Sequence, residues 1–160
     1  MKGIKELSGG LMKSITDSIE GCFQLMGGDF TNAGTASTEL KNTLVRLGVS
    51  QDIVRRVAIA AFEAEMNVII HAIAGTMHYV INIDEVKITL TDMGPGIEDI
   101  ELAMQEGYTT APDWVKEMGW GGGMGLPNIK KNADRLTIDS VVGEGTTLEI
   151  IIYMRKDNDA

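Results

Sequence analysis

The chain has 160 residues, of which 44% are hydrophobic, and its 23 acidic against 14 basic residues give a formal net charge of −9. This length and composition predict one domain with a substantial core, whereas the acidic balance argues against nucleic-acid binding, which depends on Lys and Arg contacting phosphates. The lone cysteine, Cys22, excludes an internal disulfide and a cysteine zinc site. Without a membrane-length apolar run (~18–20 residues) or a signal-peptide core, a cytoplasmic protein with no membrane partner is expected.

The N-terminal part of the chain is the hardest to interpret. Residues 1–20 are taken as an extension of uncertain structure, with a short helix over residues 11–19 as one option. A first strand is expected over residues 22–26. The domain is expected to span residues 21–155, followed by a polar tail of residues 156–160.

Two helices are expected next. The first is capped by Thr31 or Asn32 and stops at Gly48. The second and longer helix covers about residues 50–74, and Gly75 is interpreted as its stop.

The middle of this longer helix is apolar almost all round, which predicts a largely buried helix. Glu63, Glu65 and Asn67 interrupt it. Glu63 and Asn67 are four residues apart and share one face, so they form either a polar stripe facing water or a carboxylate and a carboxamide aimed into a site. Oxygen donors of this kind suit Mg²⁺. Glu65 lies on another side and is expected in solvent, and His71 is expected to be a structural histidine.

A hairpin is predicted from residues 77–83 and 86–91, which alternate between apolar and polar positions. Asp92 has the same parity as the apolar positions of the second strand, so it points toward the apolar side, where a carboxylate needs a partner. The following turn, residues 92–97, contains two glycines and a proline that leave the backbone bare. The turn is either a place where a ligand is recognised by hydrogen bonds or the solvated end of a strand.

A short helix is predicted over residues 98–106, and residues 107–124 show no periodicity, which is typical of a lid or a disordered segment. A glycine-rich stretch, residues 121–125, leads into a helix that has Pro127 in its first turn. Such a junction offers free N–H groups to a phosphate, although a flexible loop before a helix explains the same pattern.

A second hairpin, formed by residues 136–142 and 146–154, ends the predicted domain. The sequence contains neither a P-loop motif nor a G-x-G-x-x-G motif after a strand. The lysine and H-R-D motifs of protein kinases are also absent. These common nucleotide-binding folds are therefore not supported.

Four motifs in a fixed order are more informative together than alone. They are Glu63-x-x-x-Asn67, Asp92-x-Gly94-x-Gly96, Gly123-Met124-Gly125-Leu126 and Gly143-x-Gly145-Thr146-Thr147. Over about residues 22–154 this order resembles the histidine-kinase-like ATPase superfamily, which has the GHKL or Bergerat fold. Within it the chain is similar to the anti-sigma-factor serine/threonine kinases and their stress-cascade relatives. The supporting stretches are Glu63 to His71, Gly107-Tyr108-Thr109-Thr110 and Gly125-Leu126-Pro127-Asn128-Ile129-Lys130.

The resemblance implies an α+β fold: a two-layer α/β sandwich with a mixed, mostly antiparallel sheet and helices on one face. It implies ATP and Mg²⁺ as cofactors and transfer of the ATP γ-phosphate to a regulatory protein partner, either anti-anti-sigma-like or sigma-factor-like. A homodimer is a further expectation of the family.

The resemblance also implies roles for individual residues. Glu63 is the implied general base, Asn67 the Mg²⁺ ligand, and Asp92 the acceptor of a hydrogen bond from the adenine 6-amino group. The other implied nucleotide-binding residues are Gly94, Gly96, Ile97, Gly107, Thr109, Thr110, Gly122, Gly123, Met124, Gly125, Leu126 and Thr146.

One departure keeps an alternative function open. Kinases of this group tend to carry a basic residue just before the glycine motif, but residues 119–122 contain none, and Lys116 is the nearest in sequence. The alternative is a nucleotide-dependent protein-binding module, or an ATPase without kinase activity.

Overall fold

The computed structural model describes residues 18–155, which form two layers. One layer is a sheet with the strand order β1-β2-β3-β5-β4, and every pairing in it is antiparallel. The α/β sandwich predicted from the sequence is confirmed, but the described strands include no parallel pair. The strands are β1 (Ser18–Met26), β2 (Ala74–Asn82), β3 (Glu85–Asp92), β4 (Arg135–Val141) and β5 (Gly145–Tyr153).

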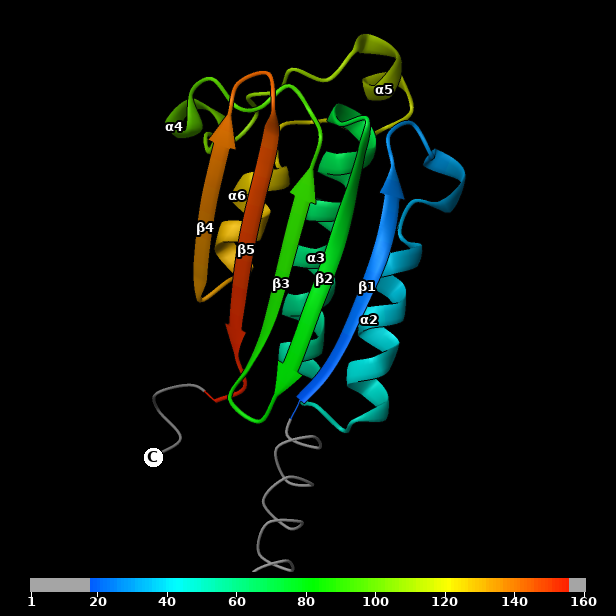
Figure 1. Cartoon of the computed structure of the whole chain (residues 1–160), viewed down its shortest axis with the longest axis vertical. Helices are drawn as coiled ribbons and strands as arrows, with labels where there is room; N and C mark the ends of the chain where they lie inside the picture. Colours follow the sequence, from blue (N-terminus) through cyan, green and yellow to red (C-terminus); the bar gives the residue numbers. More distant parts are fainter. Residues whose placement is uncertain (1–17, 156–160) are drawn as a thin grey trace, which may run out of the picture.

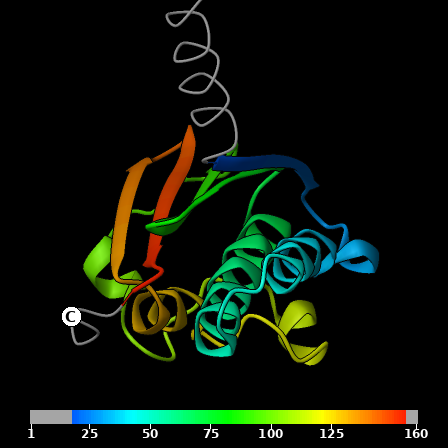
Figure 2. The ribbon, with the colours of Figure 1, turned by 90° about the horizontal axis from the view of Figure 1, so that it is seen from below.

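The second layer consists of helices, and the three long ones lie on one face of the sheet (Figure 2). The long helices are α2 (Thr35–Arg46), α3 (Gln51–His71) and α6 (Gly125–Asn132), and the short ones are α4 (Ile100–Ala103) and α5 (Asp113–Glu117). Alternate residues of β2, β3 and β5 are buried, so the sheet presents one apolar face to α3. Along α3 many of the buried residues are small, which lets the helix lie close to the sheet. They include Val57, Ala60, Ala61, Ala64 and Val68.

Strand β1 is longer than the predicted strand of residues 22–26 and begins at Ser18. Gly21 lies within this strand and pairs with Tyr79 of β2. The Tyr79 ring occupies the space where a side chain at position 21 would lie. The optional helix over residues 11–19 falls largely outside the described residues, and its last two positions belong to β1.

Helix α2 begins two to three residues later than predicted. The Asp29 carboxylate instead accepts the Asn32 N–H at 3.4 Å and caps a short 3₁₀ turn, Phe30–Asn32, and Gly34 precedes α2. The predicted cap at Thr31 or Asn32 is therefore wrong.

The end of α3 also differs from the prediction, because the helix stops at His71 and Gly75 lies within β2. A Cβ at position 75 would lie 2.8 Å from the carbonyl oxygen of Thr91 and 2.9 Å from a methyl group of Val68. Gly75 therefore allows close packing between the sheet and α3, and it does not stop the helix.

Glu65 is the clearest error of the sequence interpretation, since it is buried with 1% of its surface exposed. Its carboxylate accepts the backbone N–H groups of Gly34 at 3.1 Å, Ala36 at 3.2 Å and Ser37 at 3.0 Å. These are N–H groups at the start of α2, where Gly34 supplies no side-chain cap. Glu65 therefore caps α2 from the neighbouring helix, and the positive end of the α2 dipole favours its charge.

Among the described helices, none is both long and apolar enough to cross a membrane.

Candidate functional site

A cavity of about 800 Å³ opens between α3, the turn after β3, the segment before α6 and the first turn of α6. This volume lies within the range of about 300–1,000 Å³ usual for small-molecule sites. All the predicted site residues line the cavity except Gly94 and Gly107. The structure thus brings together residues from four separate motifs.

Glu63 and Asn67 face the cavity from adjacent turns of α3, as their spacing predicts. The amide nitrogen Nδ2 of Asn128, on α6, donates a hydrogen bond to Glu63 Oε1 at 3.2 Å. Gly125 begins α6 so close to this pair that a Cβ there would lie 3.0 Å from Asn67 Oδ1 and 3.6 Å from Glu63 Oε2. The two polar side chains therefore lie in the wall of the cavity, and the alternative of a solvated stripe is not supported.

Asp92 points toward the cavity from the end of β3, as its parity predicts. Its Oδ1 accepts the Thr146 N–H at 3.2 Å. Burial raises the pKa of the Asp92 carboxyl, while hydrogen bonds from the backbone N–H groups of Thr146 and Gly94 and the charge of His71 oppose this rise. Gly94 therefore supports Asp92 from outside the cavity lining.

The turn after β3 packs tightly against the hairpin of β4 and β5. Gly96 has a φ of +76°, and a Cβ there would lie 2.5 Å from the carbonyl oxygen of Val141. The Ser140 hydroxyl accepts the Ile97 N–H at 2.8 Å and lies 2.8 Å from the Thr146 hydroxyl. These contacts fix the backbone that forms the Asp92 end of the cavity.

The segment over residues 107–124, called the lid segment below, is predicted to be a lid or a disordered segment, and the structure places the short helix α5 within it. The two ends of the segment meet, because the Gly107 N–H donates to the Gly123 carbonyl at 2.9 Å. Before this segment, the predicted helix over residues 98–106 is reduced to the four residues of α4.

Aromatic contacts hold the lid segment against the start of the helical layer. Phe30 stacks on Trp120 with ring centroids 5.1 Å apart and meets Trp114 edge-on at 5.5 Å. Trp120 also lines the cavity. The lid segment is therefore anchored beside the cavity by contacts between residues about 90 positions apart, which no local sequence pattern indicates.

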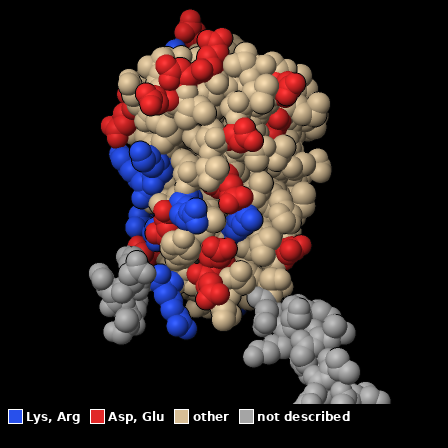
Figure 3. Space-filling view, turned by 60° about the vertical axis from the view of Figure 1, so that its left-hand side comes forward, with Lys and Arg blue, Asp and Glu red and all other residues tan. Residues whose placement is uncertain are grey.

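The charge of the cavity wall is acidic. Glu98 and Asp99 line it together with Glu63 and Asp92, and none of the lining residues is Lys or Arg. Lys116 lies on α5 and contacts Asp113 at 3.9 Å, outside the lining set. In Figure 3, acidic side chains gather at the upper end of the molecule, and basic side chains lie lower on that face.

His71, which the sequence predicts to be a structural histidine, also lines the cavity. It lies four residues after Asn67, so the face shared by Glu63 and Asn67 simply continues to it. Burial lowers the pKa of the His71 imidazole, and the Asp92 carboxylate opposes this effect. Other lining residues that were not among the predicted site residues include Phe62, Met66, Ile70, Tyr108 and Trp120.

Comparison with known proteins agrees with this geometry. The model of the histidine kinase-like ATPase domain family matches residues 28–152. The serine/threonine-protein kinase RsbT of Bacillus subtilis is 32% identical over 123 residues, which cover 72% of this chain and 84% of that protein. The anti-sigma F factor of Anoxybacillus flavithermus is 30% identical over 131 residues, covering 78% of this chain and 86% of that protein.

A structural comparison supports the fold alone. A chain of the solved SiaB–SiaC complex from Pseudomonas aeruginosa superposes with a TM-score of 0.59 at 14% identity, over 95% of this chain and 99% of that chain. The family match, the sequence relatives and the two-layer architecture agree. The chain therefore belongs to the histidine kinase-like ATPase domain family.

Proposed function

We propose that this protein binds ATP with Mg²⁺ and transfers the γ-phosphate to a hydroxyl group of a regulatory protein partner, of the anti-anti-sigma or sigma-factor type. The observation that carries the proposal is the placement of the Glu63 carboxylate next to Asn67, against the first residue of α6, in one cavity with Asp92. The names of the relatives, a serine/threonine-protein kinase and anti-sigma F factors, support the partner class. Because cells supply ATP in the cytoplasm, the proposal places the protein there.

In this proposal Asp92 selects the base by accepting a hydrogen bond from the adenine amino group. Its side chain already accepts the Thr146 N–H, and burial disfavours its charge, so a second donor would stabilise it. The start of α6 binds phosphate oxygens. No side chain caps this helix end, so the N–H groups of Gly125 and Leu126 are available to an anion.

Asn67 holds the metal ion in this proposal. The described residues contain no cluster of three or more His, Cys, Asp or Glu side chains that could hold a metal ion on their own. Mg²⁺ is typically held by one or two protein oxygens together with substrate phosphates and water, so the carboxamide oxygen of Asn67 fits its preferences. The ion supplies charge neutralisation for the triphosphate, which the acidic cavity lining does not supply.

Glu63 acts as general base by taking the proton of the attacking hydroxyl. It lies one helical turn from the proposed metal ligand, and general-base catalysis contributes about 10²–10⁴-fold to a rate. The remaining work in phosphoryl transfer is positioning and charge neutralisation. The glycine backbone at the start of α6 and the residues of the lid segment supply the positioning.

A second function, ATP-controlled binding of a partner without transfer, is favoured by one observation. No Lys or Arg lines the cavity, so no described basic side chain is placed to neutralise the phosphate in transit. In that case the protein binds ATP, or hydrolyses it slowly, and leaves the partner unmodified.

The deciding experiment incubates the protein with γ-labelled ATP, Mg²⁺ and candidate partner proteins. Labelled partner is the expected result, and the E63A variant is expected to lose at least about 100-fold in transfer rate. ATP binding without any labelled partner supports the second function. Transfer by E63A at the wild-type rate contradicts the assigned role of Glu63.

Two structural expectations belong to the same proposal. We propose residues 21–155 as the ATP-binding domain, although β1 begins slightly earlier, at Ser18. We also propose a homodimer, on the grounds of family membership alone. Light scattering on the full chain tests the dimer: a mass near 17.3 kDa contradicts it, and twice that mass supports it.

A further inference from the structure

Helices α3 and α6 meet at two polar contacts, which lie about two turns apart on α3 and one turn apart on α6. Near the start of α3, Arg56 Nε donates to the carbonyl oxygen of Asn132, at the end of α6, at 3.1 Å. Two turns later, Glu63 accepts from Asn128, one turn earlier on α6, at 3.2 Å. The helices therefore run antiparallel, and Glu63 makes the second of these two contacts.

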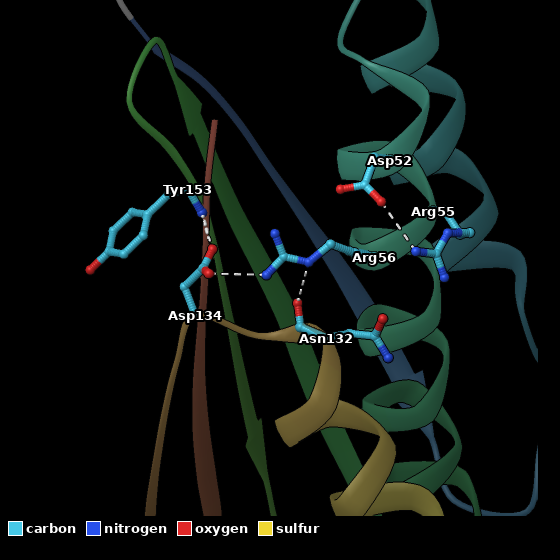
Figure 4. A network of polar contacts seen from close by, with 6 residues as sticks. All are labelled: Asp52, Arg55, Arg56, Asn132, Asp134 and Tyr153. Carbon is cyan, nitrogen blue, oxygen red and sulfur yellow. Dashed lines mark hydrogen bonds and ion pairs between the residues drawn. The ribbon is translucent and has the colours of Figure 1, made fainter. Parts of the chain in front are cut away.

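The first contact belongs to a network that fixes α6 (Figure 4). Arg56 also pairs with the Asp134 carboxylate at 3.1 Å, and Asp134 accepts the Tyr153 N–H at 2.7 Å. The end of α6 is thereby tied to α3 and to β5. A further hydrogen bond, from the Asn132 side chain to the backbone carbonyl of Asn128 at 2.8 Å, stays within α6.

Apolar packing fixes the same helix from the other side. Ile129 is fully buried, and Pro127 is buried in the first turn. Asn128 lies between these two residues, so its backbone has little freedom to move. A polar group on such a rigid element can orient a neighbouring side chain, which a mobile loop residue does less well.

The chemistry of the contact sets its direction. An ionised carboxylate only accepts hydrogen bonds, so the Asn128 amide must present its NH₂ group to Glu63. This bond engages Oε1, while Oε2 is the oxygen nearer to Gly125, 3.6 Å from the Cβ position there. One carboxylate oxygen is therefore held by α6, and the other lies on the side where Asn67 and the start of α6 meet.

We propose that Asn128 is a positioning residue for the general base: its amide holds Oε1 of Glu63, so that Oε2 faces the site of proton transfer. This inference rests on the proposed function. Asn128 touches no reacting atom in it and acts through Glu63. A purely structural role, in which Asn128 only joins the two helices, is the competing explanation.

Three variants separate the two explanations. N128A removes the donor, and N128D replaces it with a second carboxylate facing Glu63. N132A is the matched control, because it removes a side-chain hydrogen bond from the same helix and leaves the donor to Glu63 in place. Release of labelled phosphate from γ-labelled ATP, with water as the acceptor, is measured under single-turnover conditions. The dissociation constant for ATP is measured by calorimetry.

N128A is expected to slow phosphate release by about tenfold or more, because misplacement of a reacting group by about 1 Å can cost 10²-fold. Its ATP dissociation constant is expected to stay within about twofold of the wild type, and N132A is expected to match the wild type in both. In N128D, the two adjacent carboxylates repel each other, so the pair keeps one proton at a higher pH. The acidic limb of the pH–rate profile is therefore expected to shift to higher pH by about one pH unit or more.

A second readout needs no turnover. In nucleotide-free protein labelled with ¹³C at glutamate carboxyls, the Glu63 signal is assigned by its loss in E63Q. Its chemical shift is expected to change in N128A and N128D and to stay unchanged in N132A, and an unchanged shift in all three variants contradicts the contact. A wild type that binds no ATP contradicts the proposed function itself. If the wild type is active and both N128A and N128D keep its rate and pH profile, only the role of Asn128 is contradicted.

Discussion

The Asp92 carboxylate accepts the backbone N–H of Thr146 at 3.2 Å, which joins the end of β3 to the start of β5. The two residues are 54 positions apart in the chain, and each belongs to a different motif. Thr146 is itself held through its hydroxyl, which lies 2.8 Å from that of Ser140. The acid that we assign to base recognition is therefore fixed by the sheet before any ligand arrives.

Replacing Asp92 by Asn is predicted to stabilise the nucleotide-free protein at neutral pH. Burial raises the pKa of Asp92 above its ordinary value of 3.8, so the folded protein binds this proton more tightly than the unfolded chain does. The charged form therefore costs stability, and the cost appears as the pH rises above 3.8 through the raised value. Asparagine keeps an acceptor for Thr146 and removes the charge.

The measurement is thermal unfolding of wild type and D92N at several pH values. At pH 7 the variant is expected to melt higher, by no more than about 2 °C because Asp92 is only partly buried. Near pH 4 the two melting temperatures are expected to converge. A variant that melts lower at pH 7, or a difference that grows toward acid, contradicts the assigned effect of burial.

Glu65 is predicted to matter for stability, in contrast to the neighbouring Glu63. E65A leaves three N–H groups at the start of α2 without their acceptor, and it is expected to lower the free energy of unfolding by about 3 kcal/mol or more. E65Q is expected to cost about 1–2 kcal/mol, because a carboxamide has only one acceptor oxygen.

Urea denaturation provides this measurement, and E39A is the control because Glu39 is an exposed residue of α2. The control is expected to stay within about 0.5 kcal/mol of the wild type. Equal stability of E65A and E39A would falsify the capping role of Glu65.

The sequence predicts some parts of this fold well because they depend on local pattern. Helical spacing alone places Glu63 and Asn67 on one face, and strand parity alone points Asp92 inward. Glu65 could not be predicted in the same way, because its partners are backbone N–H groups 28–31 residues away. The amino-acid sequence does not show which backbone groups a fold leaves without a partner.

Glycines were a second source of error, since one residue type serves several purposes. The sequence suggests that Gly75 stops a helix, but Gly75 lies in β2. Glycine is needed there because a side chain would meet Thr91 and Val68. Gly21, which lies just before the predicted strand of residues 22–26, is inside β1, under the ring of Tyr79. Both positions are set by neighbours that only the tertiary fold provides.

We predict that ATP binding requires a glycine at position 125, because any side chain there would crowd Asn67. In G125A the new methyl group lies 3.0 Å from Asn67 Oδ1, so the carboxamide has to shift by a few tenths of an ångström away from its position in the wild type. Overpacking of this kind costs about 1–3 kcal/mol, so a loss of about tenfold or more in ATP affinity is expected by calorimetry with Mg²⁺.

Gly48 provides the opposite control, because it has a φ of +75° with open space around it and lies outside the cavity lining. G48A is expected to lower stability by about 1 kcal/mol and to leave ATP affinity unchanged. If G125A binds ATP as tightly as the wild type, the first turn of α6 does not form the metal end of the site.

The anchoring of the lid segment can be followed by fluorescence, because the protein's two tryptophans, Trp114 and Trp120, both contact Phe30. F30L removes both ring contacts, each worth about 0.5–1.5 kcal/mol. Stronger acrylamide quenching and faster proteolysis between residues 107 and 124 are expected. F23L is the control, since it removes a ring contact with Tyr79 away from the lid. Similar quenching in the two variants would mean that Phe30 does not hold the lid segment.

The central claim is that the cavity binds ATP and that Asp92 recognises the base. Calorimetric titration of ATP with Mg²⁺ into the wild type and D92N tests it most directly, because D92N changes the charge and keeps the acceptor for Thr146. We predict saturable binding to the wild type and binding at least about tenfold weaker to D92N, a loss of about 1.4 kcal/mol or more. No binding to the wild type, or equal binding by both proteins, would contradict the account.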